Sequence, residues 1–461
     1  MGSPASADHS PGKRHHGQVL PGSESSLAGR SSPELNTLAA SPPSHRHQRK
    51  RSNTGGGPGE GSSSPPNPPQ VNHQETAAKK PDPQRRRQLL SIDCSKKELR
   101  ELPAKFWTVA RQAGVINLTM NKLTELPEDG LAQCRQMIRL AAGDNLLTSL
   151  PESIGRCEQL IWADFTHNRL SSLPASIARC RYLTAIGLSD CRFTEFPEVL
   201  LKITELRKIG LFQNALRTIP PTIKALRNLA KLDLSSNELT ELPEEIGCLE
   251  NLEWLNLMNN RLKTLPDSIG RLGRLVELGV ANNQLSRLPE DLSGMHSLTM
   301  FSLYNNCLTE LPESIGSLKL LVKLEVSGNC ITEVPPSILS LPHCAFLNLR
   351  SNAIRSIPNV ELGRALRILD LRFNQIPNLP ESLFRRTFVL PEELPVGADG
   401  APVTPPAGLV LRMAGNPLRA VMQPRVGVPR LHELLVSALV GDRRLRVHVP
   451  RLPPVYLAQL Q

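Results

Sequence analysis

Aromatic residues are scarce in this 461-residue chain: Phe, Trp and Tyr together make up only 3% of it. A globular core of this size normally depends on large aromatic side chains. Aliphatic residues, chiefly leucine and isoleucine, must therefore supply the core, as they do in a solenoid whose repeats each add one thin layer. The composition favours a repeat protein over a compact globular fold.

Paired cysteines and long apolar runs are also missing. The nine cysteines contain no C-x-x-C pair and no terminal cluster of the kind that caps secreted repeat proteins, and Cys134, Cys157 and Cys180 recur at repeat spacing. That usage is typical of small buried side chains in a reducing compartment. No apolar run reaches about 18 residues, and no signal-peptide core is found. We expect a cytoplasmic protein without a transmembrane segment, with nuclear or peripheral membrane sites as alternatives.

The sequence has no Walker A loop, no H-E-x-x-H motif and no G-x-S-x-G elbow. Cys344 and Arg350 have the spacing of a tyrosine-phosphatase loop, but residues 345–349 read Ala-Phe-Leu-Asn-Leu. A phosphatase needs a glycine-rich cradle of N–H groups and a reactive thiolate. We interpret the segment as a repeat strand with Cys344 at a core position, and we expect no enzyme activity and no cofactor.

Asp144, His167 and Asp190 occupy equivalent places in successive repeats, with Asp164 nearby. A metal site would need such ligands to converge. Solvated polar residues at strand ends explain the spacing better, so we expect no metal.

Positive charge is concentrated at the two ends of the chain, which has a net charge of +11. Residues 1–90 contain 12 Lys and Arg against 6 Asp and Glu, and residues 409–461 contain 8 against 2. The long middle is almost neutral, which argues against a nucleic-acid groove along it.

Residues 1–88 are rich in Ser, Pro, Gly, His and basic residues, with few large apolar ones. Such a segment cannot bury enough surface to fold, so we expect a disordered tail. Met1-Gly2-x-x-x-Ser6 fits the N-myristoylation pattern at Gly2, and the basic tail would supply a second membrane signal. The candidate phosphosites are Ser10, Ser32, Ser41, Ser52 and Ser64.

Asparagine marks one repeat position along the middle of the chain. The spacing is 23 residues, with one interval of 24 and one of 22, and Cys191 replaces one asparagine. A proline lies six residues after every one of these twelve positions. The marked asparagines are Asn121, Asn145, Asn168, Asn214, Asn237, Asn260, Asn283, Asn306, Asn329, Asn352 and Asn374. We call them ladder asparagines, because stacked repeats would place them one above another.

The unit from Leu252 to Ile269 shows why the pattern suits a solenoid. Leu255 and Leu257 would alternate inward on a short parallel strand. The asparagine would satisfy backbone groups where the chain leaves the strand, and the proline would fix φ where the return segment begins. One unit alone buries little, so stability must come from its neighbours.

This pattern resembles the leucine-rich-repeat superfamily, in particular the intracellular 23-residue type found in Ras-suppressor-like proteins, Ras/Raf-pathway scaffolds and plant intracellular Ras-group-related proteins. The resemblance implies an α/β leucine-rich-repeat solenoid over residues 89–420. Its curved parallel sheet would form the concave face, with short helical or 3-10 segments on the convex face. It also implies a protein-binding scaffold, with small-GTPase signalling as a family analogy.

The ends of a solenoid need caps. Residues 90–103 read as a truncated first repeat, with Phe106 and Trp107 closing that end. Residues 387–408 read as an insertion loop, and a degenerate repeat follows through Gly415-Asn416-Pro417. Residues 421–461 are expected to form a helical cap.

Residues two, four and six before each ladder asparagine should point out of the sheet, where the core does not need them. Large or polar side chains at these positions are the kind that dominate interfaces. Their alternative role is to shield neighbouring strands. The candidate protein-binding residues are Trp162, Asp164, Phe212, Trp254, Asn256, Met258, Tyr304, Phe346, Arg350 and Arg372.

The C-terminal segment supports an alternative function. Pro429-x-Leu431-x-Glu433-Leu434 and Leu452-Pro453 loosely resemble the elongin-binding boxes of ubiquitin-ligase substrate receptors. Leu431 and Leu435 would share one helix face and contact the ligase adaptor. A plain capping helix also needs a leucine stripe, so both interpretations stay open.

Overall fold

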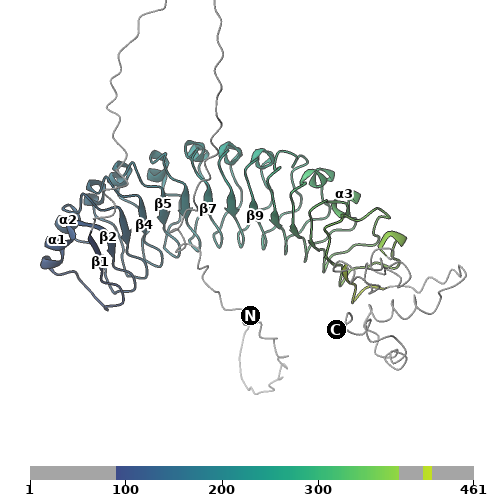
Figure 1. Ribbon diagram of the computed structural model, residues 1–461, viewed down its shortest axis with the longest axis horizontal. Coiled ribbons are helices and arrows are strands. Elements are labelled where there is room, and N and C mark those ends of the chain that lie inside the picture. Colours follow the sequence, from purple (N-terminus) through teal and green to yellow (C-terminus); the bar gives the residue numbers. More distant parts are fainter. Residues whose placement is uncertain (1–89, 384–408, 418–461) are drawn as a thin grey trace, which may run out of the picture. The chain divides into compact units, whose positions relative to one another are not determined.

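A curved solenoid is seen in the computed structural model, which describes residues 90–383 and 409–417. Fourteen parallel strands follow one another in chain order along the concave side, and short helical segments line the convex side (Figure 1). The predicted fold class is confirmed. The strands are β1 (Leu90–Asp93), β2 (Ala113–Asn117), β3 (Arg139–Ala141), β4 (Trp162–Asp164), β5 (Ala185–Gly187), β6 (Lys208–Gly210), β7 (Lys231–Asp233), β8 (Trp254–Asn256), β9 (Glu277–Gly279), β10 (Met300–Ser302), β11 (Lys323–Glu325), β12 (Phe346–Asn348), β13 (Ile368–Asp370) and β14 (Val410–Arg412).

The strands pair so that identical repeat positions lie opposite one another. Leu255 in β8 is opposite Leu232 in β7 and Leu278 in β9. The middle residue of each three-residue strand points into the core, and the two flanking residues point away from it, as the twofold alternation of a strand requires. Each repeat position therefore forms a continuous row across the sheet.

The convex segments begin at the prolines of the repeat. In η8, Pro266 precedes the helix with φ −66°, and the buried Ile269 donates its N–H to the Pro266 carbonyl at 3.0 Å. Proline suits this place because it fixes φ and needs no hydrogen-bond acceptor. The 3-10 helices are η3 (Glu152–Arg156), η4 (Ala175–Arg179), η5 (Glu198–Lys202), η6 (Pro221–Ala225), η7 (Glu244–Cys248), η8 (Asp267–Arg271) and η9 (Glu313–Ser317). The α-helices are α1 (Ala104–Ala110), α2 (Glu128–Leu131) and α3 (Pro336–Leu339).

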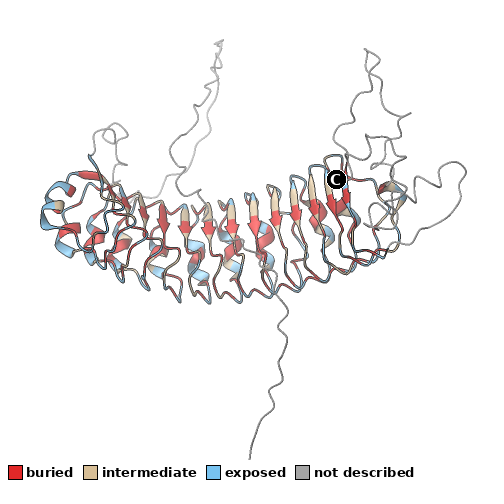
Figure 2. Ribbon diagram, turned by 90° about the horizontal axis from the view of Figure 1, so that it is seen from below, coloured by how far each residue is buried: buried red, intermediate tan, exposed pale blue. Residues whose placement is uncertain are grey.

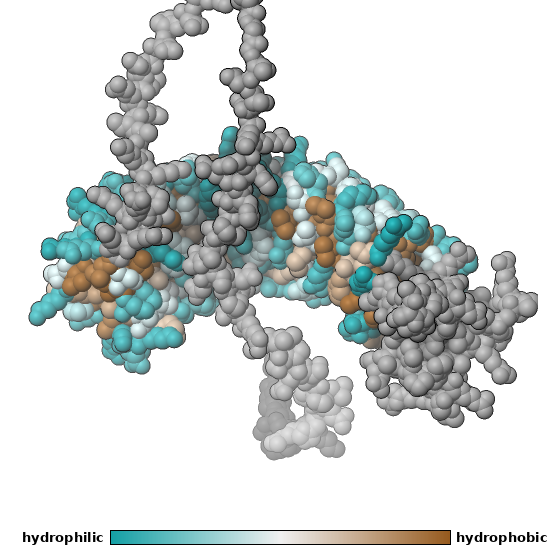
Figure 3. Space-filling view, viewed as in Figure 1, coloured by the Kyte–Doolittle hydropathy of each residue, from teal (hydrophilic) through white to brown (hydrophobic). Residues whose placement is uncertain are grey.

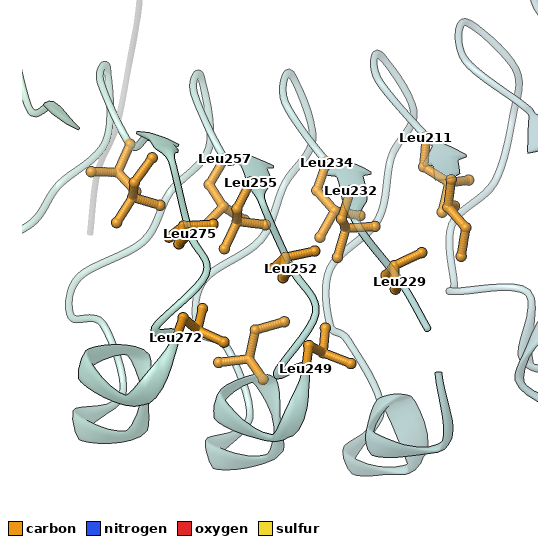
Figure 4. Packing of buried hydrophobic residues seen from close by; sticks show 14 of the residues in the cluster. Leu211, Leu229, Leu232, Leu234, Leu249, Leu252, Leu255, Leu257, Leu272 and Leu275 are labelled. Atoms are coloured by element: carbon orange, nitrogen blue, oxygen red, sulfur yellow. The ribbon is translucent and has the colours of Figure 1, made fainter. Parts of the chain in front are cut away.

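The core lies between the sheet and the convex segments as a stack of leucine layers. Figure 4 shows Leu252, Leu255 and Leu257 of one repeat beside the equivalent leucines of the preceding repeat. All three are completely buried. Because each layer packs only on its neighbours, stability is shared along the stack.

The ladder asparagines make the predicted backbone contacts. The Asn260 Nδ2 donates to the carbonyls of Leu234 (2.9 Å) and Leu257 (3.0 Å). Its Oδ1 accepts the N–H of Leu239 at 3.0 Å. The preceding residue, Asn259, is left-handed with φ 56°. That conformation costs a non-glycine residue about 1–2 kcal/mol, which the asparagine contacts help to offset.

Helix α1 covers the N-terminal end, directly after the segment expected to form the cap. Trp107 is 5% exposed and meets Phe106 edge to face, with ring centroids 5.0 Å apart. It packs so closely on Gly130 that a Cβ there would lie 2.4 Å from the indole ring. The absence of a side chain at Gly130 therefore lets the tryptophan close the first layers.

Strand β14 continues the sheet at the other end. Val410 is opposite Ile368 of β13, and Asn416 forms the next rung of the ladder. Its Nδ2 donates to Leu371 O and its Oδ1 accepts Ile376 N–H, at 2.8 and 3.1 Å. The expected insertion at 387–408 and the helical cap at 421–461 lie outside the described residues.

Candidate protein-binding face

The concave face consists of the side chains six, four and two residues before each ladder asparagine on β3–β14. Figure 2 looks onto it and shows the strands coloured as buried or intermediate, with exposed residues mainly in the connecting segments. Nine of the ten candidate residues are partly buried, and Arg350 is exposed. Neighbouring strands about 4.8 Å apart cover the flanks of these side chains, so they are partly buried although they lie outside the core.

Trp162 and Asp164 of β4 are held by neighbouring repeats and by their own strand end. The Arg139 guanidinium carbon lies 4.8 Å from the centroid of the Trp162 ring. Asp164 Oδ1 accepts the N–H and the hydroxyl of Thr166, at 3.1 and 2.7 Å. These contacts fix a cation–π pair and a carboxylate side by side.

The middle of the face is less polar. Asn256 Nδ2 donates to Ser235 Oγ at 3.1 Å. Met258 leans over the next strand, so that a Cβ on Gly279 would lie 3.0 Å from its Cε. Phe212, Trp254 and Tyr304 are partly buried in the same region. The side chains of Met258 and its aromatic neighbours therefore make the middle of the face, around Gly279, largely apolar.

Charged groups accompany aromatic ones towards the C-terminal repeats. The Lys323 ammonium lies 5.5 Å from the Phe346 ring centroid, and the Arg350 guanidinium lies 4.9 Å from that of Phe373. Lys323 also pairs with Glu325 at 3.2 Å. Each of these cations is thus placed by a neighbouring residue before any ligand binds.

Arg372 is held by Asp370, and Arg412 of β14 adds a second positive charge 3.6 Å from the same carboxylate. Burial alone would raise the pKa of Asp370, but the hydrogen bonds from Arg372 and the charges of Arg372 and Arg412 outweigh it and hold that pKa below its usual value. The carboxylate is therefore ionised at neutral pH.

Phe373 is a residue of this region that sequence reasoning missed. It is 49% exposed and supports Arg350, although it precedes a ladder asparagine and has φ 56°. Bulky residues rarely adopt a left-handed conformation. An aromatic residue at a position where most repeats have a polar one or glycine was the available signal.

Cys344 is a core residue, as predicted. It is 1% exposed, and burial raises the pKa of its thiol to about 11. A nucleophilic cysteine needs an accessible thiolate near neutral pH. The Cys344 thiol is neither accessible nor ionised near neutral pH.

Asp144, His167 and Asp190 all lie at left-handed positions that precede the ladder. His167 Nδ1 contacts Asp190 Oδ2, and Asp190 Oδ1 accepts Gln213 Nε2 at 3.1 Å. Within the described ranges, no three His, Cys, Asp or Glu residues are grouped as metal ligands. The left-handed residues that precede the ladder therefore make polar contacts between repeats.

Several candidate residues lie outside the described residues: Gly2, the five N-terminal serines, Leu431 and Leu435. Within 90–383 and 409–417, no helix combines the length and apolar character needed to cross a bilayer. Figure 3 shows a mainly hydrophilic surface on which hydrophobic residues gather in separate groups.

The repeat geometry can be compared with known proteins. Residues 221–307 match a family model described as a leucine-rich repeat region. The described chain is a leucine-rich-repeat solenoid. No curated protein sequence matches the chain.

Solved structures with the same fold include a leucine-rich-repeat protein of Leptospira interrogans. It is 27% identical with a TM-score of 0.60, and the match covers 76% of this chain and 93% of that one. The plant peptide hormone receptor RGFR1 in complex with RGF2 is 26% identical with a TM-score of 0.51, over 68% of this chain and 53% of the receptor. An internalin from Listeria monocytogenes is 18% identical with a TM-score of 0.50, over 63% of this chain and 75% of the internalin. At this identity the similarity concerns the fold alone.

Proposed function

We propose that this leucine-rich-repeat protein is a non-catalytic scaffold or adaptor that binds a protein partner on its concave face. The observation that carries the proposal is the set of large side chains outside the core. Trp162 and Phe346 are held by neighbouring cations, and Arg372 by Asp370. Aromatic and arginine side chains that are already ordered lose little entropy on binding and often dominate interfaces.

The size of the face supports the same function. Twelve strands spaced about 4.8 Å apart give a surface roughly 55–60 Å long, enough for a standard protein interface. The plant receptor structure, in which the protein is in complex with RGF2, is one precedent for binding by this fold.

A paired substitution tests the proposal. Phe212→Ala with Trp254→Ala should abolish capture of the main partner found by affinity purification, while the melting temperature stays nearly unchanged. Leu320→Ala with Val322→Ala is the matched control, because both residues are exposed but lie off the concave face. Partner capture that survives the first pair, together with a lower melting temperature, would mean that the aromatic residues only shield the strands.

The proposed setting is intracellular signalling in the cytoplasm, with small GTPases as the partner class. It rests on the resemblance to the 23-residue repeat type. Purified full-length protein should then retain a Ras-type GTPase in one nucleotide state more than in the other. Equal retention in both states, or none, would remove this setting and leave the scaffold proposal standing.

The alternative is a substrate receptor of an elongin/cullin-type ubiquitin ligase. The C-terminal pattern around Leu431 and Leu435 favours it, and the same tail resembles that of leucine-rich repeat-containing protein 58. Recovery of elongin subunits by the full chain, lost on Leu431→Ala without unfolding, would decide for the ligase receptor. If the segment is only a cap, Leu431→Ala should instead cost about 2–5 kcal/mol of stability.

A further inference from the structure

Two lysines of the concave face lie opposite one another without a partner. Lys208 of β6 pairs in register with Lys231 of β7, and both are partly buried. Among the residues that the structure describes, no hydrogen bond or ion pair involves either ammonium group. Like charges directly opposite in a sheet destabilise it. The free protein therefore holds two like charges side by side, neither of them in an ion pair with a described residue.

The other cations of this face are compensated. Arg139 and Arg350 lie over aromatic rings, Lys323 pairs with Glu325, and Arg372 and Arg412 share Asp370. Lys231 is adjacent to Trp254 in register, yet it makes no cation–π contact with it within the described ranges. The lysine pair thus differs from the other cations of this face.

Electrostatics agree with this geometry. Burial and the neighbouring charge of Lys231 lower the pKa of Lys208, although Glu253 acts in the opposite direction. Asp233 is on the same strand as Lys231, but its Oδ1 accepts the Ser235 hydroxyl at 2.6 Å and the two lysines form no ion pair with it. The two ammonium groups therefore lack, within the described ranges, a hydrogen-bonded anion, which an incoming carboxylate would supply.

Two glycines lie beside the lysines on the concave face. Gly187 and Gly210 are opposite one another in β5 and β6. A Cβ on Gly210 would meet nothing closer than Ser189 Oγ at 3.2 Å. The Asp164 carboxylate leans over Gly187, where a Cβ would lie 2.4 Å from its Oδ1, so the low floor beside Lys208 is the backbone of Gly210.

A less polar floor lies farther along the sheet. Trp254, Met258, Met300 and Tyr304 are partly buried on β8–β10 and on the segments that follow these strands, around Gly279. Methionine and aromatic side chains adapt well to an apolar ligand. The distance from the lysine pair to β9 is about 12 Å at the usual strand spacing. An extended chain covers it in about three or four residues.

We infer that the concave face recognises an extended acidic segment of a partner protein. A carboxylate of that segment binds between Lys208 and Lys231. A large apolar side chain three or four residues away lies on the floor formed by Trp254, Met258 and Tyr304. The inference rests on the proposed function and names the chemistry of the partner.

The test is selection of a random twelve-residue peptide library on the full-length protein. Enriched peptides should carry Asp or Glu three or four residues from Leu, Ile, Phe, Trp or Met. Lys208→Glu with Lys231→Glu should switch the enriched charge to Lys or Arg and keep the apolar residue. Lys202→Glu with Lys263→Glu is the control, because it changes the charge equally at exposed residues off this face.

Affinities of synthetic peptides with the enriched sequences complete the test. Lys208→Gln with Lys231→Gln, a milder change, should weaken binding of acidic peptides by at least about tenfold, since two charge contacts are lost. Binders that need Phe212 and Trp254 but ignore the lysines would overturn this inference alone. Binders that also ignore Phe212 and Trp254 would overturn the proposed function as well.

Discussion

Arg372 holds Asp370 in a two-point ion pair at the end of β13. Nε donates to Oδ1 at 2.9 Å and Nη2 donates to Oδ2 at 2.6 Å. The carboxylate side chain is 3% exposed and the guanidinium side chain 30%. A buried carboxylate bound by this planar fork is fixed in orientation as well as in charge. The same contact orders the C-terminal end of the concave face.

Asp370→Asn should therefore destabilise the last repeats. It leaves Arg372 and Arg412 without their carboxylate, at an expected cost of about 1–3 kcal/mol. Amide hydrogen exchange should accelerate in β13 and β14, while β4 and β5 stay protected, because a solenoid transmits the loss only to neighbours. Asp164→Asn is the control, since Asp164 is bound by Thr166 and not by an arginine. Uniform acceleration along the solenoid would contradict this account.

The same pair predicts the sign of a pH effect. The pKa of Asp370 is lowered in the folded protein, so its contribution is present above the ordinary carboxyl value of 3.8 and is lost as pH falls through the folded pKa. The acid sensitivity of β13 and β14 should be weaker in Asp370→Asn. Equal acid sensitivity in both proteins would assign it to other carboxyl groups.

The hydrogen bonds of the ladder asparagines predict that two substitutions change the stability of the protein in opposite directions. Asn260→Ala leaves the Leu239 N–H without its acceptor inside the core and should cost about 1–3 kcal/mol. Cys191→Asn should stabilise the protein by about 1 kcal/mol, because the thiol makes only a 3.5 Å contact with Phe165 O at the place of a ladder asparagine. Thermal melts of both variants measure the signs, and a destabilising Cys191→Asn would show that the neighbouring repeats have adapted to the thiol.

The ladder and the strand rows were predictable because one chemical requirement returns in every repeat. An asparagine at fixed spacing needs the same backbone partners each time, so Asn121 and Asn374 follow the rule without knowledge of their surroundings. The lack of an ion pair at Lys208 and Lys231 within the described residues was not predictable, because it depends on the side-chain rotamers of neighbouring strands. Phe373 has the left-handed backbone of its repeat position, but its aromatic side chain is not shared by the other repeats. Its contact with Arg350 therefore does not follow from the recurrence of the pattern.

Cys344→Ser tests the core assignment of the phosphatase-like motif. A hydroxyl in place of this buried thiol should destabilise the fold by about 1–3 kcal/mol, because the site is closed to water and the Phe346 carbonyl, which accepts from the thiol, is 3.5 Å away. The purified wild-type protein should show no phosphatase turnover. Turnover that disappears in Cys344→Ser at equal foldedness would overturn the non-catalytic proposal.

The stacked thiols predict loss of stability in alkali. Burial raises the pKa of Cys134 from 9.0 to about 11 and that of Cys180 to about 12. The folded pKa values lie above the unfolded one, so the contribution of each thiol to the free energy of unfolding is complete below pH 9. It is lost as the pH rises towards 12, by at most about 1.4 kcal/mol per thiol and pH unit. Urea titrations between pH 8 and 11 measure the slope. Cys134→Ala with Cys180→Ala should make it shallower, and an unchanged slope would assign alkaline unfolding to other groups.

Trp107 predicts how the N-terminal end fails. Trp107→Ala removes the buried ring that lies against Gly130 and should cost about 3–5 kcal/mol. The loss should appear first as faster hydrogen exchange in β1–β3, because each repeat is stabilised by its neighbours. Trp107→Phe should be much milder, since it keeps an aromatic ring and removes a buried indole N–H that has no hydrogen-bond partner among the described residues. Equal destabilisation by the two substitutions would mean that a phenyl ring cannot replace the indole, so that the full size of the Trp107 side chain is what closes this end of the solenoid.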